Sequence, residues 1–551
     1  MMLDPLVRLI SIPFLAGLVC IGLPRQWEKA RAWLSVTACA ITLLEAVLLP
    51  GGEARSLEIA GWPLLQVDKL SGLMLVAAAF FALLIAIYSL GYLQSIRWIA
   101  NQPDDADTGK RRIERPSDGW RHRIYHGCLL GSLAFSCIVF LANDLVLLLT
   151  AWGMLALTLY LMIGIVGQDA AEASRKTFVM VGGSDSLLLL CTALFWVEHG
   201  TTRMDAGVLS LNSVSSYIAF LCLLVAVLAK VGAIPLQSWL PDFAEKAYAP
   251  VTAYLPASLD KLLGIYLLVR AIMGLFGMTD GVSALLMVIG AVTILGGAMM
   301  ALVQQNLKRL LAYCAISQVG YILLAIGTGT VAGLAAGLFH MLNHAICKSC
   351  LFLGAGVVEQ TTGTVDLDRL GGLATRLPLT FAACLVAALS VSAIPPLNGF
   401  ASKWMIYQSV IESGQDNEGM LWVVWLAVAM LGSALTMAVV VKLLHAVFLC
   451  KPSPIVRELK ISRAPISAVL PMAMLAGLCV AFGVLVNEFP MRWFILPAVG
   501  EPVTFTGTWL AGQATILLLI AFLLGWLVYA LTLRHGKLRK VPTFIGGERL
   551  D

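Results

Sequence analysis

Apolar stretches of about 20 residues recur along the whole chain, separated by short polar segments. A helix of about 20 apolar residues spans the hydrocarbon core of a bilayer. This template predicts helices over residues 5–23, 31–49, 68–93, 125–142, 144–166, 176–197, 213–235, 251–274, 282–304, 308–328, 331–356, 377–401, 420–448, 465–487 and 510–533. The pair Asn143-Asp144 divides the fourth helix from the fifth, and Pro395-Pro396 lies near the end of the twelfth. We therefore predict an all-α polytopic membrane protein with about 15 transmembrane helices.

Composition agrees with this prediction and excludes other classes of protein. Hydrophobic residues make up 59% of the chain, charged residues only 13%, and the mean hydropathy is +0.88. Soluble domains are about one quarter charged. A soluble globular protein, a disordered chain and a nucleic-acid reader are therefore excluded. The net charge of +5 does not indicate a charged partner, because the Lys and Arg residues lie mostly in loops between apolar stretches.

The distribution of charge between loops predicts the orientation. Basic residues follow the odd-numbered helices, at Arg25, Lys29 and Arg31, in the segment 97–123, at Arg175 and Lys176, at Lys308 and Arg309, at Lys451 and Arg457, and in the tail LRHGKLRK. Loops after even-numbered helices carry acidic residues instead, for example Glu53 and Glu488. Positive loops stay in the cytoplasm. We predict a cell inner (plasma) membrane protein with its N-terminus outside and its C-terminus cytoplasmic.

Neither a cofactor nor a metal site is predicted. Most of the twelve cysteines lie inside apolar stretches, where cysteine packs as a small hydrophobe. The one close pair, Cys347 and Cys350, is more typical of helix packing than of redox chemistry. The N-terminus lacks a basic region and a cleavage site, which indicates a retained first helix. No segment is long enough for a nucleotide or flavin domain, so any redox centre belongs to partner proteins.

Ionisable residues occur inside the predicted helices, where they cost several kcal/mol each and usually mark an ion pathway. They are Glu45, Asp185, Lys230, Asp260, Lys261, His340, His344, Lys348 and Lys403. Three of them share the segment GLFHMLNHAICKSCLF at spacing i, i+4 and i+8, which places them on one helix face. Imidazole both accepts and donates a proton near neutral pH, and a desolvated lysine sheds its proton more easily than one in water. A proton path is favoured over a buried core histidine or an HxxxH metal site.

Two predicted helices are interrupted next to a lysine. Lys230 precedes GAIPLQSWLP, where Pro235 ends the helix, and Lys403 follows SAIPPLNGFAS. Interrupted helices at membrane depth line water-filled cavities or ion sites. The alternative for each lysine is an interfacial side chain that reaches the membrane surface.

Together these segments resemble the antiporter-like, proton-translocating membrane subunits of respiratory complex I, group 4 membrane-bound hydrogenases, formate hydrogenlyases and Mrp-type Na⁺/H⁺ antiporters. The resemblance covers roughly residues 60–410. It rests on VDKLSGLMLVAAAFFALLIAIYSLGYL, AKVGAIPLQSWLPDFAEKAYAPVTAYLPAS, NLKRLLAYCAISQVGYILLAIG, FHMLNHAICKSCLFLGAG and IPPLNGFASKW.

The resemblance implies two inverted five-helix repeats, each containing a broken helix, joined by a central polar axis. It assigns Lys230 to the first broken helix, His340, His344 and Lys348 to the central relay, and Lys403 to the second broken helix. Uptake at Lys230, transfer along the relay and release through Lys403 is the implied route. Four further residues are candidates for a counter-charge or for tuning: Asp260, Lys261, Asp185 and Lys308. The implied division is 1–124 for three N-terminal helices and a basic loop, 125–274 and 282–419 for the two halves, and 420–551 for the rest.

Two positions depart from the family pattern. Members usually carry a Trp-Glu pair in the fifth helix, whose Glu pairs with the first lysine, but this chain has Trp152-Gly153. A relay histidine is expected in the eighth helix, where this chain has Pro256. We hypothesise that Asp260 supplies the missing counter-charge, since an opposite charge within about 4–6 Å stabilises a protonated lysine. Alternatively, Asp260 only neutralises Lys261 or faces a neighbouring subunit.

The leading prediction is a proton-translocating membrane subunit of a complex I-like NADH-quinone oxidoreductase or a membrane-bound hydrogenase. Its expected partners are other membrane subunits, the lipid bilayer and H⁺ or Na⁺, with no nucleic acid. Alternatives are a subunit of an Mrp-type Na⁺/H⁺ antiporter, the membrane subunit of an energy-coupled inorganic-carbon uptake system, and a non-conducting scaffold. Hydrogenase or quinone-reductase genes, small antiporter-subunit genes, or a carbonic-anhydrase-like gene nearby would distinguish the first three.

Overall fold

A computed structural model of the chain describes residues 4–49, 55–59, 62–100, 119–416, 420–459, 464–503 and 511–534. The chain forms two compact units, Met1–Gly507 and Thr508–Asp551. The second unit contains one helix, α21 (Ala511–Arg534). The basic residues predicted after the third helix, at 101–118, and in the tail beyond residue 534 lie outside the described residues. All following statements on packing concern the first unit.

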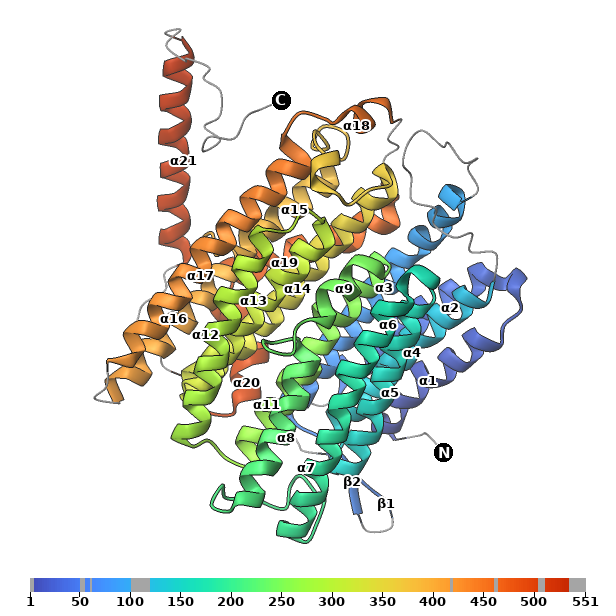
Figure 1. Cartoon of the computed structure of the whole chain (residues 1–551), viewed down its shortest axis with the longest axis vertical. Coiled ribbons are helices and arrows are strands. Elements are labelled where there is room, and N and C mark those ends of the chain that lie inside the picture. Colours follow the sequence, from blue (N-terminus) through green and yellow to red (C-terminus); the bar gives the residue numbers. More distant parts are fainter. Residues whose placement is uncertain are drawn as a thin grey trace. The chain divides into compact units, whose positions relative to one another are not determined.

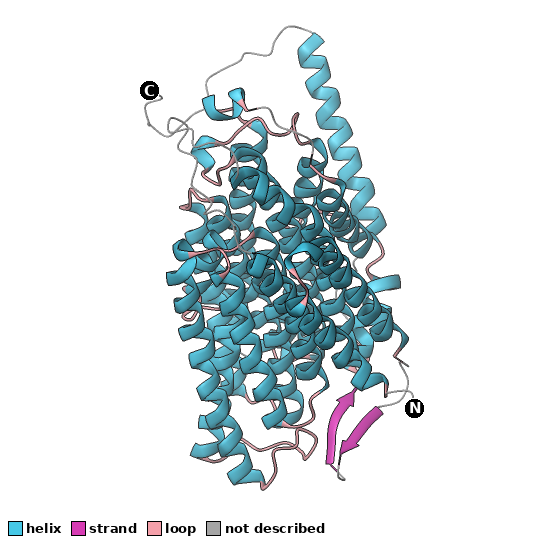
Figure 2. Ribbon diagram, turned by 90° about the vertical axis from the view of Figure 1, so that its right-hand side faces the viewer, coloured by secondary structure: helices cyan, strands magenta, loops and turns pink. Residues whose placement is uncertain are grey.

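The N-terminal part is a helical hairpin, a short β-hairpin and a long helix. It comprises α1 (Pro5–Gly22), the turn η1 (Arg25–Trp27), α2 (Glu28–Leu48), β1 (Arg55–Ile59), β2 (Trp62–Val67) and α3 (Lys69–Ala100). The two strands pair antiparallel, with Arg55 opposite Val67, and Figure 2 shows them at one end of the helical bundle. They were not predicted, because strands of five and six residues are short and no apolar stretch marks them. We call this end the hairpin end.

The next helices form the first repeat, drawn in cyan to green in Figure 1. They are α4 (Gly119–Leu141), α5 (Leu145–Gly164), η2 (Gln168–Ala170), α6 (Ala171–Thr177), the π-helical turn η3 (Phe178–Gly182), α7 (Gly183–His199), α8 (Val214–Val231), α9 (Trp239–Lys246), α10 (Ala249–Tyr254), the π-helical turn η4 (Leu255–Leu259), α11 (Asp260–Arg270) and the π-helical turn η5 (Ala271–Leu275). Asp144 begins α5 by accepting hydrogen bonds from the N–H groups of Val146 and Leu147, which explains the predicted division at Asn143-Asp144.

The second repeat follows, drawn in yellow-green to orange. It comprises α12 (Asp280–Leu302), α13 (Leu307–Gly327), α14 (Val331–Thr362), η6 (Leu367–Arg369), α15 (Pro378–Val391), α16 (Asn398–Asp416), α17 (Leu421–Leu444) and the π-helical turn η7 (His445–Leu449). After it come α18 (Pro454–Glu458), α19 (Ile466–Val484), the π-helical turn η8 (Asn487–Ile495) and α20 (Leu496–Val499). Figure 1 shows the two repeats side by side.

Among the described residues, twelve helices are long and apolar enough to cross a membrane. The remaining three predicted helices correspond to less regular segments: 249–275 contains two π-helical turns, 378–416 is broken, and the apolar part of α21 is Leu519–Thr532. A membrane protein is therefore confirmed, whereas the count of fifteen and the four-part division of the chain stay predictions.

Both predicted interruptions are breaks within longer crossings. Helix α8 ends at Val231 and is capped by Gly232, which has a positive φ of 68°, and α9 begins only after Pro235. A side chain at Gly232 would meet Leu240, so the turn needs glycine for space as well as for conformation. Helix α15 ends at Val391, and α16 begins after Pro395-Pro396. Predicted helix 213–235 ended at the first break, whereas predicted helix 377–401 ran through the second, and in both cases a further helix follows the break.

The two broken helices run in opposite directions. Ion pairs join Lys176 in the last turn of α6, Asp242 in the first turn of α9 and Arg309 in the first turn of α13. We call this the basic end of the bundle. The crossing α8–α9 runs toward the basic end. Helix α15 runs away from it, because Asp366, in the segment between α14 and α15, forms a β-bridge with Asn306, which directly precedes α13. Opposite directions are what an inverted repeat requires.

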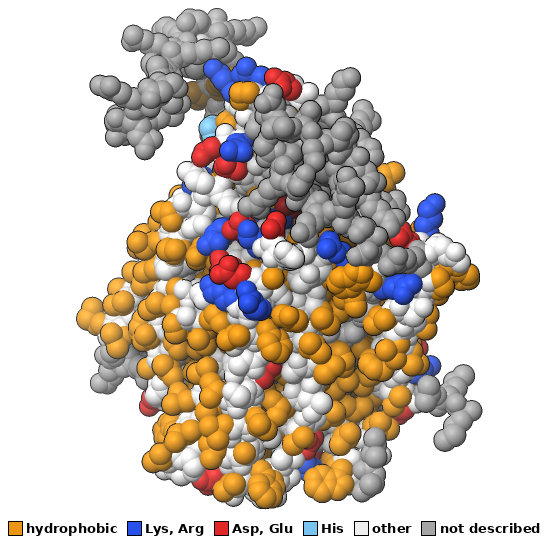
Figure 3. Space-filling model, turned by 45° about the vertical axis from the view of Figure 1, so that its right-hand side comes forward, with side chains coloured by type: hydrophobic (Ala, Val, Ile, Leu, Met, Phe, Trp, Pro, Cys, Tyr) orange, Lys and Arg blue, Asp and Glu red, His pale blue; other side chains and the backbone are white. Residues whose placement is uncertain are grey.

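The interior is formed by α13 and α14, and the surface of the bundle is apolar. In the apolar stretch of α14, 100% of the residues are buried inside the protein, whereas in α1 only 28% are. Figure 3 shows hydrophobic side chains over the flank, with Lys, Arg, Asp and Glu gathered toward the upper end. An apolar flank is suited to lipid. The polar residues of α14 therefore face other helices rather than the membrane.

Candidate functional site

Lys230 lies in the last turn of α8, immediately before the first break. Its side chain is 1% exposed, and its Nζ is 3.7 Å from Oδ1 of Asp260. The Trp152 ring centroid is 5.2 Å from the same amine. Asp260 follows the π-helical turn η4 directly, and its side chain is 3% exposed. Asp260 therefore lies where the counter-charge hypothesis requires it, next to the Lys230 amine.

Lys261 sits at the same break but contacts the backbone. Its Nζ donates a hydrogen bond to the carbonyl of Val231, the last residue of α8. The Trp239 indole donates to the carbonyl of Ala229 at 3.0 Å. Carbonyls at a helix C-terminus lack intrahelical partners and form the negative end of the helix dipole. The break therefore provides an acceptor for a buried ammonium.

The three predicted relay residues lie on α14 as the spacing indicated. The exposed fractions of His340, His344 and Lys348 are 2%, 2% and 0%. His340 Nδ1 is 2.9 Å from the hydroxyl of Ser402, the neighbour of Lys403 in sequence. The amide of Asn398 donates to Asn343 Oδ1 at 2.8 Å, and Asn343 donates to the Asn398 carbonyl at 3.1 Å. This reciprocal pair fixes α14 against the start of α16.

Lys403 lies at the second break and is 0% exposed. Its Nζ donates to the carbonyl of Val391, the last residue of α15, at 3.2 Å, and lies 4.4 Å from the centroid of the Tyr321 ring. Within the described residues, no carboxylate forms an ion pair with Lys403. Its charge is therefore offset by a carbonyl and an aromatic face alone.

Electrostatic contacts connect the two breaks through α14. Lys261 and Lys348 both act on His344, and His340 feels the charge of Lys403. Lys348 also acts on Lys403. The predicted relay residues between the two breaks therefore lie within electrostatic range of their neighbours in the proposed order.

Several polar atoms of this group are buried without a hydrogen-bond partner from the protein. They are Lys230 Nζ, Asp260 Oδ2, His340 Nε2, both ring nitrogens of His344, and Lys348 Nζ. Buried polar groups are satisfied by protein or by ordered water in nearly all proteins. A row of such atoms therefore marks positions where water molecules can bind between the side chains.

A cavity of about 300 Å³ lies beside Lys403 and opens between α16 and α17. It is lined by Ser392, Ala393, Phe400, Lys403, Trp404, Tyr407, Met430, Ser433, Ala434 and Met437. Hydroxyl groups line one wall, where Ser433 Oγ is 2.6 Å from the Tyr407 hydroxyl and 3.0 Å from that of Tyr321. Sequence reasoning missed this cavity, because its lining comes from segments up to 45 residues apart.

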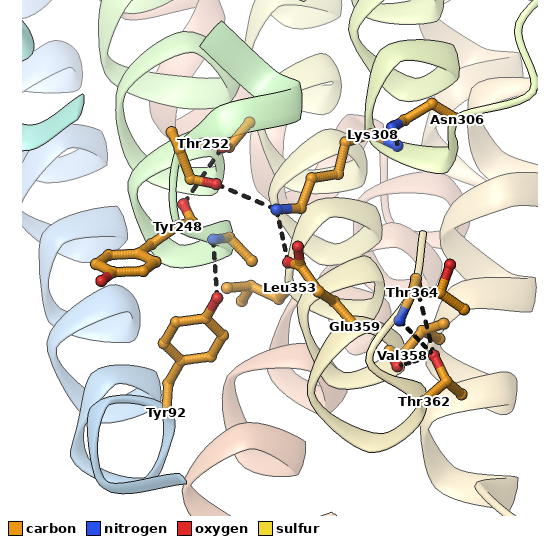
Figure 4. Close-up of polar contacts among 12 residues, drawn as sticks. Tyr92, Tyr248, Thr252, Asn306, Lys308, Leu353, Val358, Glu359, Thr362 and Thr364 are labelled. Carbon is orange, nitrogen blue, oxygen red and sulfur yellow. Dashed lines mark hydrogen bonds and ion pairs between the residues drawn. The ribbon is translucent and has the colours of Figure 1, made fainter. Parts of the chain in front are cut away.

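Lys308 belongs to a separate site at the basic end, shown in Figure 4. Its Nζ is 2.6 Å from Glu359 Oε2 and donates to the carbonyl of Ala247, the residue that ends α9, at 3.1 Å. The contacts join α13 and α14 to the end of α9, and a tuning role for Lys308 stays a prediction. Glu359 was missed. It follows Lys348 by 11 residues, about three helical turns, and extending the α14 stripe would have found it.

Of the remaining ionisable residues, Glu45 pairs with an N-terminal arginine and Asp185 interacts with Lys230. Glu45 pairs with Arg8 of α1 at 3.1 Å, far along the chain from the relay. Asp185 of α7 acts electrostatically on Lys230. A Cβ atom added at Gly153 would lie 4.0 Å from Asp185 Oδ2. Pro256, which stands where a histidine was expected, lies in the π-helical turn η4 just before Asp260.

Among the described residues, no three His, Cys, Asp or Glu side chains are placed to hold a metal ion. Cys347 and Cys350 are both buried and free. Cys347 contacts Ser390, and Cys350 donates to backbone carbonyls of Ala383 and Met472. Both thiols are thus used in packing between helices.

Residues 142–446, more than half of the chain, match the family model described as NADH:quinone oxidoreductase/Mrp antiporter, TM. The chain belongs to this family of antiporter-like membrane subunits. It is 30% identical over 506 residues to hydrogenase-4 component B of Escherichia coli (strain K12), covering 85% of this chain and 70% of that protein.

Two further likenesses agree with the assignment. NADH-quinone oxidoreductase subunit L of Mycobacterium tuberculosis (strain CDC 1551 / Oshkosh) is 31% identical over 461 residues, covering 81% of this chain and 67% of that protein. A chain of the membrane-bound sulfane sulfur reductase, an archaeal respiratory membrane complex, superposes with a TM-score of 0.77 at 25% identity. That match covers 99% of this chain and 88% of the other.

Proposed function

We propose that this chain is a proton-translocating membrane subunit of a larger redox-driven complex, and that its partners are other membrane subunits. The relatives support this proposal: one is a hydrogenase component, one is a subunit of an NADH-quinone oxidoreductase, and a structural neighbour belongs to a respiratory complex. The redox reaction takes place in the partner subunits. This chain contributes the path for the ion.

The observation that carries the proposal is the row of buried polar atoms between the two breaks. His340, His344 and Lys348 each present at least one nitrogen without a hydrogen-bond partner from the protein. Burying so many unpaired ionisable groups is costly for stability alone. Their retention is explained if water connects them and a proton moves along the row. Protein side chains then provide the proton-binding positions, and water bridges the distances between them.

In the proposed mechanism, Lys230 accepts a proton while Asp260 stabilises the ammonium that forms. The proton passes through water to Lys261 and on to His344, whose two ring nitrogens can accept on one side and donate on the other. Lys348 and His340 carry it to Lys403. Each positively charged member repels a second proton on its neighbour, so the row is occupied stepwise.

We also propose that the chain lies in the cell inner (plasma) membrane with its basic end in the cytoplasm. Lys176 and Arg309 lie at this end, and the positive-inside rule favours the cytoplasm for them. The N-terminus then lies outside. A cysteine introduced at either end and labelled with a membrane-impermeant thiol reagent in intact cells tests the orientation.

The function is tested by pH-gradient formation in sealed vesicles that contain the intact complex. Lys348→Met and Lys403→Met are expected to abolish the gradient while the complex still assembles and its redox partners still react. Lys246→Met, which removes a half-buried lysine paired with Glu245 on α9, is the matched control and is expected to leave the gradient unchanged. Normal proton movement in both relay variants would disprove the path. A gradient that requires sodium would instead indicate Na⁺ as the ion.

A further inference from the structure

Lys230 is flanked by two acidic residues that come from different helices and differ in exposure. Asp260 on α11 is 2% exposed and faces the interior. Asp185 on α7 is half-buried and interacts electrostatically with Lys230. Lys230 therefore lies between an inner and an outer carboxylate, and only the inner one forms an ion pair in this structure.

Both carboxylates follow an irregular turn of helix. Asp260 comes directly after the π-helical turn η4 (Leu255–Leu259), and Asp185 comes three residues after η3 (Phe178–Gly182). A π-helical turn inserts one residue into a helix and rotates all later side chains, and such turns are frequent at functional sites. Two of them within one repeat direct an acid toward the same lysine.

Gly153 leaves the space on α5 that allows the Asp185 carboxylate to lie close to this helix. Helix α5 packs against α7, and glycine leaves open the position where α5 would carry a side chain next to Trp152. The Asp185 carboxylate lies at the edge of this position, 4.0 Å from where a Cβ atom would be. The Trp152 ring is also in contact range of the Lys230 amine. An acid on α7 thus reaches the surroundings that a longer side chain on α5 would occupy.

The surroundings of Asp185 make a purely structural role costly. Asp185 lies near the middle of the membrane-crossing segment Gln168–His199. In the same segment, the apolar side chains of Val179 and Leu189 are 69% and 57% exposed on the surface of the bundle. The buried Oδ1 of Asp185 accepts no hydrogen bond from the protein. An ionised carboxylate at this depth costs several kcal/mol unless it binds a proton or a nearby cation. The cation within electrostatic range of Asp185 is Lys230.

We propose that Asp185 is the outer proton-binding residue of the first site and exchanges its proton with Lys230. In the transfer, the O–H bond of the Asp185 carboxylic acid breaks and an N–H bond forms on the neutral Lys230 amine, directly or through one water. The products are the Asp185 carboxylate and the Lys230 ammonium, which then pairs with Asp260. This inference rests on the proposed function and adds a second proton-binding residue to the first site.

The test compares Asp185→Asn and Asp185→Glu in vesicles that contain the intact complex. The amide cannot bind and release the proton, so at least a tenfold loss of proton translocation is expected, with assembly and redox activity of the partners retained. Asp185→Glu keeps the carboxyl group and is expected to retain at least half of the rate. Glu198→Gln is the matched control on the same helix, because Glu198 is exposed and contacts only Ser213 and Ser215 among the described residues.

A relocation variant makes the test specific. Gly153→Glu combined with Asp185→Asn returns a carboxyl group to the same surroundings from α5, and it is expected to recover at least a third of the wild-type rate. Normal translocation in Asp185→Asn, while Lys348→Met is inactive, would overturn the role of Asp185 and leave the proposed function intact. Normal translocation in both variants would overturn both proposals.

A second measurement applies if Asp185→Asn does not assemble. A membrane-soluble carbodiimide reacts with protonated carboxyl groups, so it is expected to modify Asp185 in the wild-type complex and stop translocation in parallel with the modification. Peptide mass spectrometry locates the modified residue. Modification of Asp185 without loss of translocation, or loss of translocation without modification of Asp185, would contradict the inference.

Discussion

The two breaks share their backbone chemistry but differ in how they compensate charge. At each break a buried lysine donates to the last carbonyl of the helix that ends there, Lys261 to Val231 and Lys403 to Val391. Only the first break adds carboxylates, because Asp260 pairs with Lys230 and Asp185 lies nearby. The hypothesis that Asp260 replaces the acid missing at Gly153 therefore predicts a counter-charge on a different helix at the first break.

This difference has an energetic consequence. A buried ammonium beside a carboxylate is compensated, whereas the ammonium of Lys403 relies on a carbonyl and on the face of the Tyr321 ring. The second break instead has a cavity whose mainly apolar lining includes the hydroxyl groups of Ser392, Tyr407 and Ser433. We infer that the first site keeps its proton by ion pairing and that the second releases it easily into the cavity.

Removing the carboxylate at the first break is expected to have the largest effect. Asp260→Ala leaves Lys230 buried without its ion-pair partner, which costs about 3–5 kcal/mol for a buried pair. The double variant Lys230→Met/Asp260→Leu removes both charges and is expected to recover most of the stability but no proton translocation. Thermal unfolding of the purified complex measures the first effect, and vesicle assays measure the second. Equal stability of Asp260→Ala and wild type would show that the pair is not compensating charge.

The corresponding change at the second break is expected to be smaller, because no ion pair is lost. Tyr321→Leu removes the aromatic face above Lys403 and costs about 2 kcal/mol. Tyr321→Phe keeps that face and loses only the hydroxyl contacts with Ala429 and Ser433, at about 1 kcal/mol. Stability and translocation are measured for both variants. If Phe were as damaging as Leu, the hydroxyl group and not the ring would be the important part.

The ion pair at the basic end tests whether its charges belong to the relay. Glu359 is 29% exposed, so Glu359→Gln is expected to cost only about 1 kcal/mol of stability, less in high salt. Translocation is expected to stay at the wild-type rate, since Lys308 fastens α9, α13 and α14. A translocation loss greater than the loss of assembled complex would place Glu359 on the proton path.

The smallest expected effect comes from filling the cavity beside Lys403. Ala434→Met places a longer side chain in the cavity and is expected to slow translocation about threefold, equivalent to less than 1 kcal/mol. Ala427→Met lies two turns earlier on the same exposed side of α17 and outside the cavity, so no change is expected there. Stability should be unchanged in both. Equal rates for the two variants would argue against release through this cavity.

Local sequence was sufficient for most of the helices and for the shared face of His340, His344 and Lys348, whereas their role as a relay stays a prediction. Hydrophobic stretches located the crossings to within a few residues, and proline and glycine located the breaks, because these signals act over one or two helical turns. The spacing of His340, His344 and Lys348 likewise fixed a shared face of α14, since a regular helix repeats every 3.6 residues. The β-hairpin at Arg55–Val67 escaped prediction because its strands are short and weakly patterned.

Only the tertiary structure decided which charges meet. The hypothesis that Asp260 serves Lys230 could be written from sequence, but its alternatives could not be separated, because the two residues are 30 positions apart on different helices. The approach of Asp185 to the space left by Gly153 and the pairing of Lys308 with Glu359 also join distant segments. Hydrophobicity and periodicity determine how each helix is built and which face is polar. Packing angles and π-helical turns determine where that face points, and in a membrane protein this decides which buried charges are compensated.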